Sequence, residues 1–261
     1  MSNYQKLTIV GACVLLVTLF FGFSTKPDTL IQQEKVRALN STSTNIDIIQ
    51  RDVLKDLTGD QRASIQILEA RIEEAQDTVE RVESLKELSG TWFRYGEYAL
   101  AGSAAEKVAE AIGDAQSWSI AGTTYARGIS DQSVEKKTAY CKEKAIECLE
   151  NAISIDPDNI DHKLNRGILF ANYPEQTNPM KGIQILLKLN KNHPENVPVM
   201  NNLAKFALQT NQLDRAQVRL QKAAELDPNN RMTNCLSMEL YTKLGELSKA
   251  EQFRAKCELK I

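Results

Sequence analysis

The chain opens with an unbroken apolar stretch. Residues 7–23 (LTIVGACVLLVTLFFGF) carry no charge and are flanked by Lys6 and Lys26. Wound as a helix, this stretch is about 25 Å long, at the short end of what spans a hydrocarbon core of about 30 Å. It predicts an uncleaved membrane anchor within residues 1–24. Cleavage as a signal peptide after Ser24 is the alternative, although Gly22-Phe23-Ser24 matches the small-residue cleavage pattern poorly.

Beyond the apolar stretch the pattern becomes polar and then helical. Residues 25–60 contain a Ser/Thr/Asn cluster and only a short apolar pattern, which predicts a spacer with helical pieces. From residue 61 onward, Ile65, Leu68 and Ile72 recur at helical spacing, so an amphipathic helix opens a folded domain over 61–261. Twelve Gly and seven Pro in 261 residues suit a helical protein. We therefore expect an all-α fold.

Helix-ending turns recur along this domain. They lie at Pro157, Pro194 and Pro228, each followed two residues later by Asn, and Pro stops a helix while Asn favours a turn. The last two prolines are 34 residues apart and the first two 37, which is one period plus three. The same ladder of small or apolar residues precedes every turn: Ala145, Leu149, Ala152; Gly182, Leu186, Leu189; and Ala216, Leu220, Ala223. The domain is therefore expected to be an array of repeats.

Upstream of the first ladder stands Trp118-x-x-Ala121-Gly122-x-x-Tyr125. Together with the period, this pattern resembles the tetratricopeptide repeat, a pair of antiparallel helices. The resemblance runs from about Thr78 to the end and implies a right-handed solenoid of about five units. Extra residues around 130–137 and 174–179 are expected to lengthen the turns inside two units.

The resemblance also divides the residues into scaffold and surface. A helix pair cannot bury its apolar face alone, so neighbouring pairs share a core. The residues expected to form that core are Trp92, Trp118, Gly122, Tyr125, Ala145, Gly167, Ala204 and Ala216.

Binding is expected on the concave face, which the first helix of each pair builds in this family. Asn165 and Asn202 occupy equivalent positions, two residues before Gly167 and Ala204, and Asn201 and Lys205 lie nearby. Side-chain amides donate and accept together, so they can hold the backbone of a peptide. The plainer alternative is that these asparagines are solvated or structural.

Composition gives little support to other functions. The net charge of -2 indicates no basic nucleic-acid face, and the five cysteines have no metal-ligand spacing. Cys141 and Cys148 are separated by about 10 Å of helix, too far to form a disulfide. Both histidines fall near turns, where a surface location is expected. We expect no catalysis, no cofactor, no metal and no small-molecule substrate.

These observations predict a single-span scaffold that binds a peptide or partner protein. Because a short amino-terminal tail usually stays in the cytoplasm, the repeat domain is expected in the periplasm, anchored to a bacterial inner membrane. A cytoplasm-facing domain, a cleaved periplasmic form and a self-associating assembly factor are the alternatives. Self-association would use the helix near Glu69 to Glu83 or an exposed end of the stack. The sequence names neither the partner nor the oligomeric state.

Overall fold

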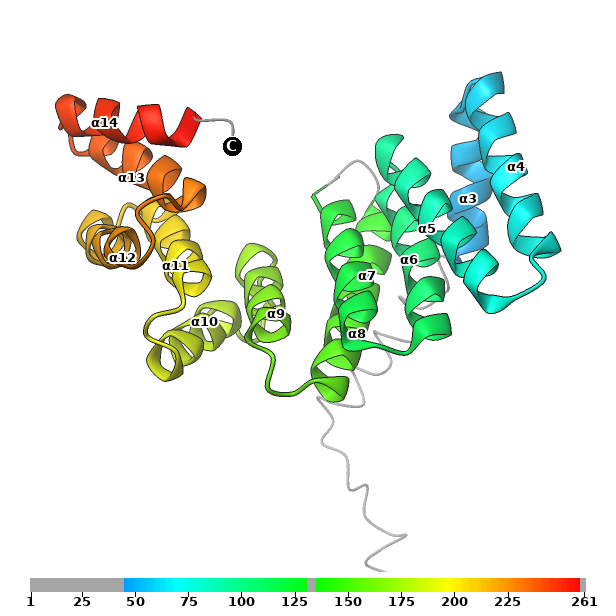
Figure 1. Cartoon of the computed structure of the whole chain (residues 1–261), viewed down its shortest axis with the longest axis horizontal. Helices are drawn as coiled ribbons and strands as arrows, with labels where there is room; N and C mark the ends of the chain where they lie inside the picture. The colour runs from blue at the N-terminus through cyan, green and yellow to red at the C-terminus, as the bar shows by residue number, and fades with distance from the viewer. Residues whose placement is uncertain (1–44, 131–134, 259–261) are drawn as a thin grey trace, which may run out of the picture. The chain divides into compact units, whose positions relative to one another are not determined.

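The computed structural model describes residues 45–130 and 135–258, and these form twelve α-helices without a strand (Figure 1). The helices belong to one compact unit, Ile46–Ile261. From α4 onward each helix packs against the next helix along the chain. The predicted all-α repeat fold is confirmed. The predicted anchor, residues 7–23, lies outside the described residues, and none of the helices that are described is long and apolar enough to cross a bilayer.

Five helix pairs follow an amino-terminal pair of different sequence. The first pair is α3 (Ile46–Asp56) and α4 (Gly59–Glu74). The later pairs are α5 (Thr78–Arg94) with α6 (Tyr98–Ile112), α7 (Ala115–Gly128) with α8 (Glu135–Ile155), α9 (Ile160–Asn172) with α10 (Lys181–Asn192), α11 (Val197–Gln209) with α12 (Leu213–Leu226), and α13 (Arg231–Lys243) with α14 (Leu247–Glu258).

The predicted spacer, residues 25–60, includes a helix that joins the core. Ile49 of α3 is 7% exposed and belongs to the main apolar cluster, which also contains Ile65 and Leu68 of α4. The compact unit therefore begins at Ile46, earlier than the expected start at residue 61.

The turns between pairs stop one helix and start the next. After Pro157, Pro194 and Pro228, the side chains of Asn159, Asn196 and Asn230 accept a backbone N–H from the first turn of α9, α11 and α13. These caps satisfy donors that a helix start otherwise leaves unbonded. At the start of α7, Gly113 (φ 78°) and Asp114, which accepts from the Ser117 backbone N–H, do the same work without proline.

The turns inside three pairs share another geometry. Gly96, Asn211 and Gly245 all have left-handed φ, and the residue after each donates its N–H back to the preceding helix. This is the helix-ending arrangement that favours Gly or Asn.

The expected scaffold residues lie mostly in the core. Seven of them are buried, namely Trp92, Gly122, Tyr125, Ala145, Gly167, Ala204 and Ala216, whereas Trp118 is partly buried against the main cluster. The small residues permit close helix crossing. A Cβ on Gly122 would lie 2.7 Å from Cγ of Leu149, and one on Gly102 would lie 2.4 Å from Cδ1 of Tyr125.

The longer of the two insertions, around residues 130–137, was expected only to lengthen a turn. It also extends a helix. Helix α8 has 21 residues, and its added amino-terminal turns pack against α7 of the same pair. Cys141 is fully buried there because Gly128 leaves room for it; a Cβ on Gly128 would lie 2.6 Å from the Cys141 sulfur. Tyr140 packs edge-on against Tyr125 at 6.0 Å. The described residues from Glu135 onward are helical because they have apolar surface to cover.

A disulfide that the cysteine spacing did not predict joins Cys235 of α13 to Cys257 of α14. Cys141 and Cys148 remain buried thiols.

The expectation that both histidines lie on the surface was wrong for His162, which is 2% exposed. The third residue of α7, α9, α11 and α13 is buried in every case (Ser117, His162, Val199 and Thr233), so the register of the repeat places His162 inside.

Candidate functional site

The candidate site is the side of the first helices α7, α9 and α11 that carries Ile120, Asn165, Asn202 and Lys205, which we call the first-helix face. Packing between pairs brings α7 against α9 and α11 against α13. Asn165 of α9 is half-buried, and its Nδ2 donates to Oγ of Ser119 on α7, at 3.2 Å. The same side chain thus joins two pairs and stays partly accessible.

The predicted equivalence of Asn165 and Asn202 holds for position but not for bonding. Asn202 is 9% exposed, and its Nδ2 donates to the carbonyl of Pro198 one turn earlier in α11, at 2.9 Å. It therefore bonds within its own helix, whereas Asn165 bonds across to another.

Asn201 is buried and joins two helices instead of facing a ligand. It is 1% exposed; its Nδ2 donates to Oδ1 of Asn230 at 3.1 Å, and its Oδ1 accepts from Oγ1 of Thr233 at 3.0 Å. Asn230 is also the cap of α13. The Asn201 amide thus holds α11 to the start of α13 and faces the interior of the domain.

The accessible part of the first-helix face combines an amide, a cation and an apolar side chain. Lys205 is half-buried on α11, one turn from Asn202, and makes no ion pair within the described part of the chain. Ile120 of α7 is 50% exposed, next to the Ser119 that Asn165 contacts. Such a set can hold peptide backbone, a carboxylate and an apolar side chain.

A partly buried polar network lies in the helices that support this face. Oη of Tyr125 (α7) donates to Oε2 of Glu106 (α6) at 2.7 Å, and Nζ of Lys144 (α8) donates to Oε1 of the same carboxylate at 2.9 Å. Glu106 thereby joins three helices. Burial, with the neighbouring Tyr140 and Glu106, raises the pKa of Tyr125, so its hydroxyl stays a donor. Burial alone would lower the Lys144 pKa, but its hydrogen bonds to Glu106 and Glu147 outweigh that effect and raise it.

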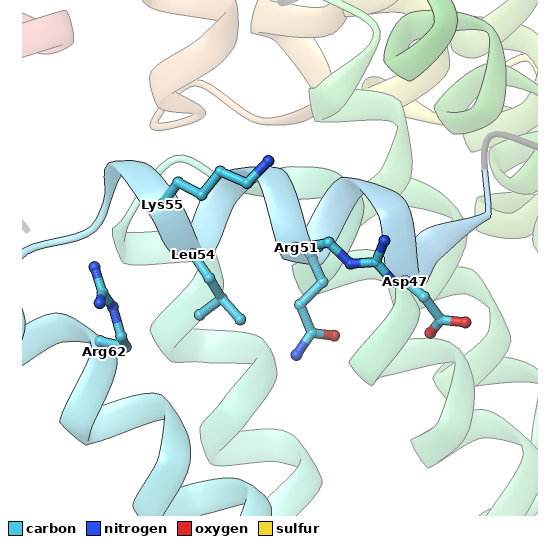
Figure 2. A pocket seen from close by; sticks show the side chains of 6 residues that line it. Asp47, Arg51, Leu54, Lys55 and Arg62 are labelled. Carbon is cyan, nitrogen blue, oxygen red and sulfur yellow. The ribbon is translucent and has the colours of Figure 1, made fainter.

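Two surface hollows elsewhere fit a binding role less well than the first-helix face does. A hollow of about 570 Å³ lies beside α3, and its lining combines one apolar side chain, Leu54, with the polar side chains of Asp47, Gln50, Arg51, Lys55 and Arg62. Figure 2 shows these side chains. Lys55 of this hollow pairs with Asp52 at 2.7 Å, and the walls carry both signs of charge. A second hollow, of about 490 Å³, lies between α12, α13 and α14, against Leu220, Tyr241 and Phe253. Neither includes a predicted site residue.

Comparison with known proteins finds one protein family that matches part of this chain. Residues 142–159 and 197–230 match the family model described as the tetratricopeptide repeat. The first range covers the end of α8 and the turn after it, and the second covers α11, α12 and the turn that follows. No curated protein matches the sequence.

Several solved structures resemble the chain at low identity. One comes from a functional characterization of Pseudomonas aeruginosa pilF (19% identity, TM-score 0.47, covering 69% of this chain and 76% of that one). Another is a thermophilic tetratricopeptide repeat protein of Thermus thermophilus (19%, 0.49, 81% and 95%). A crystal structure of MamA is a third (16%, 0.42, 65% and 92%). At such identities the similarity concerns the fold alone.

The matched family is an interaction module, and no catalytic family is indicated. The helix pairs of this chain and their capped turns make the described domain an all-helical repeat array, and its two matched segments are similar to the tetratricopeptide repeat.

Proposed function

We propose that this chain is a membrane-anchored docking protein whose first-helix face binds an extended segment of a partner protein. The observation that carries the proposal is that Asn165 and Lys205 lie on successive first helices, α9 and α11, with polar atoms that the described residues leave for a ligand. The amide oxygen of Asn165 takes part in no hydrogen bond within the described residues, and Lys205 has no carboxylate partner there. Both groups are half-buried, so they can contact a ligand without losing much side-chain freedom.

The chemistry favours a particular kind of segment. An extended peptide presents backbone N–H and C=O groups that an amide can bond. A carboxylate on the segment would pair with Lys205, and an apolar side chain would cover Ile120, which is 50% exposed. We therefore propose an extended partner segment that carries an acidic and an apolar residue.

Nothing in the last described helix favours the alternative of self-association through the end of the stack. Leu247 of α14 is 69% exposed, but Glu251, Arg254 and Lys256 are exposed on the same helix, so no continuous apolar face is present there. Near the other predicted interface, Ile67 and Val79 are exposed singly, on different helices.

The location follows from the predicted anchor and stays a proposal. Residues 7–23 would hold the protein in a bacterial inner membrane, with the repeat domain in the periplasm. Amino-terminal sequencing of the mature protein separates this from cleavage after Ser24. Protease digestion of intact spheroplasts separates a periplasmic from a cytoplasmic domain, since only a periplasmic domain would be degraded.

The docking test is affinity purification of the full-length protein from membranes, with partner recovery quantified. Asn165→Ala combined with Lys205→Ala removes both polar contacts while leaving Asn201 in place. The matched control, Lys188→Ala with Asn192→Ala, changes two exposed residues of the second helix α10. We expect partner recovery to fall at least about fivefold in the first variant only, the loss of roughly 1 kcal/mol of binding energy. Equal recovery from both variants would exclude the first-helix face.

A further inference from the structure

The last helix pair is closed by a covalent bond as well as by packing. Cys235 and Cys257 are 22 residues apart, with Cα atoms 4.8 Å from each other, and they form the disulfide between α13 and α14. The Nε of Arg231 also donates to the carbonyl of Cys257 at 3.1 Å. Both contacts hold the end of α14 to the beginning of α13.

Packing alone holds α14 weakly. Its only fully buried residue is Ala250, whereas the corresponding helix of the preceding pair, α12, buries Ala216, Leu220 and Ala223. Phe253 is partly buried and stacks on Tyr241 with ring centroids 5.5 Å apart, in the middle of the pair. The final turn of α14 has little apolar surface to bury, so the disulfide supplies the attachment that hydrophobic contact does not.

The other thiols of the domain cannot compete for oxidation. Cys141 and Cys148 are both fully buried. Burial, followed by the charge of Glu106, raises the pKa of Cys148 to about 12, so almost none of it is thiolate at neutral pH. Because thiol–disulfide exchange proceeds through the thiolate, buried thiols of this kind stay reduced. Cys235 and Cys257 are only half-buried.

We infer that Cys235 and Cys257 are oxidised in the cell, that the repeat domain reaches its final form in an oxidising compartment, and that the chain is a substrate of a thiol–disulfide oxidoreductase. Structural disulfides persist in the periplasm and outside the cell and are rare in the cytosol. The inference concerns the location of the proposed docking protein and does not depend on which ligand the first-helix face binds. It favours an extracytoplasmic over a cytoplasm-facing repeat domain.

The reaction balances as a two-step exchange. The thiolate of one cysteine attacks a sulfur of the oxidoreductase disulfide, forming a mixed disulfide and releasing one enzyme thiolate. The second cysteine then attacks the mixed disulfide, which forms the Cys235–Cys257 bond and releases the other enzyme thiolate. Two electrons pass from the cysteine pair to the enzyme, and the two protons lost by Cys235 and Cys257 are available to its dithiol.

The test counts thiols in the full-length protein. Cells are quenched in acid, and the denatured protein is labelled with a maleimide–polyethylene glycol before or after reduction. The chain has five cysteines, so the disulfide predicts three adducts before reduction and five after it. Cys235→Ser should give four adducts in both conditions, because Cys257 loses its partner. In cells that lack the oxidoreductase activity the wild type should give five.

Several results would overturn the inference. Five adducts before reduction in normal cells would show that the pair is reduced. A count of two before reduction and four after it in Cys235→Ser would show a disulfide that does not use Cys235, and a reductant-sensitive dimer on a gel would show a bond between chains. The count is independent of partner recovery, so failure here is distinguishable from failure of the docking proposal.

A second measurement reports the structural role of the bond. Reduction of the purified full-length protein should speed amide hydrogen exchange at least tenfold in α14 (Leu247–Glu258) and leave α7 and α8 unchanged. Exchange that is equally slow in both states would mean that packing alone closes the pair.

Discussion

Replacing Asn201 by alanine tests whether this predicted ligand contact instead holds the domain together. The amide of Asn201 bonds to Asn230 and Thr233 across the junction between α11 and α13, and it is 1% exposed. Alanine removes both bonds and leaves a small void. We expect the last pair, α13 with α14, to loosen while the preceding pairs keep their stability, because repeat arrays unfold largely through nearest-neighbour interfaces.

The magnitude follows from the groups left behind. Each lost hydrogen bond contributes about 1 kcal/mol net, and an unsatisfied buried group costs about 1–3 kcal/mol. The Thr233 hydroxyl can still donate to Oδ1 of Asn230, which lies 3.2 Å away, and this limits the penalty. We therefore expect a loss of about 2 kcal/mol, or an opening equilibrium about 30-fold more favourable for the last pair.

Asn202→Ala is the matched control. Its side chain bonds to the Pro198 carbonyl, which already lies within the hydrogen-bond ladder of α11, and alanine favours a helix more than asparagine does. We expect a change below about 0.5 kcal/mol. Hydrogen exchange followed by mass spectrometry of the full-length protein gives both values by segment. Equal protection of α13 in the two variants would refute a structural role for Asn201.

Three further predictions concern the interior. Tyr125→Phe should lower stability by about 2 kcal/mol, since it removes a 2.7 Å bond to the Glu106 carboxylate, and a thermal shift below about 1 °C would contradict this. Gly182→Ala should lower the stability of the domain by about 1–3 kcal/mol, because the new Cβ would lie 2.1 Å from a backbone nitrogen of α9. Gly90→Ala is the control: its Cβ would have its nearest neighbour at 3.8 Å, so it should be neutral or slightly stabilising. Urea unfolding measures both changes. The raised pKa of Lys144 implies a contribution to stability that is complete below its ordinary pKa of 10.5 and is lost as the pH rises through the folded-state pKa. The wild type and Lys144→Met should therefore differ in stability at pH 7 and converge at strongly alkaline pH.

The repeat architecture was predictable because each turn between pairs is determined by residues within the turn itself. The prolines and asparagines at 157–159, 194–196 and 228–230 stop and start helices without help from distant residues. The fate of the longer insertion was not predictable in the same way. Whether residues 135–141 form turn or helix depends on Gly128 of another helix, which makes room for Cys141.

The repeat register of the candidate asparagines was predictable from the sequence, whereas the surroundings of each side chain were only partly predictable. Asn165 and Asn202 do occupy equivalent positions, but their bonds depend on which neighbours the pairs bring near. Comparing registers could have identified the buried residues: the fifth residue of α7, α9 and α11 is Ser119, Leu164 and Asn201, all of them buried. An asparagine in line with a leucine at an inward position indicates an internal role.

The disulfide was missed because its cysteines have no motif spacing. They are brought together by the turn at Gly245, with Cys235 ten residues before it and Cys257 twelve after it, at nearly equal distances along two antiparallel helices. Once the helix pair is assigned, that near symmetry about the turn is the signal.

The Pro-x-Asn turns have a consequence for how this array can change. Because each ends one pair and caps the next with its own side chains, a pair together with its following turn carries nearly all the local information for its own boundaries. Both insertions lie inside pairs, and none separates Pro157, Pro194 or Pro228 from its asparagine. Whole helix pairs can therefore be gained, lost or exchanged at these turns. A new pair would have to match its neighbours only in the amide and hydroxyl contacts between first helices.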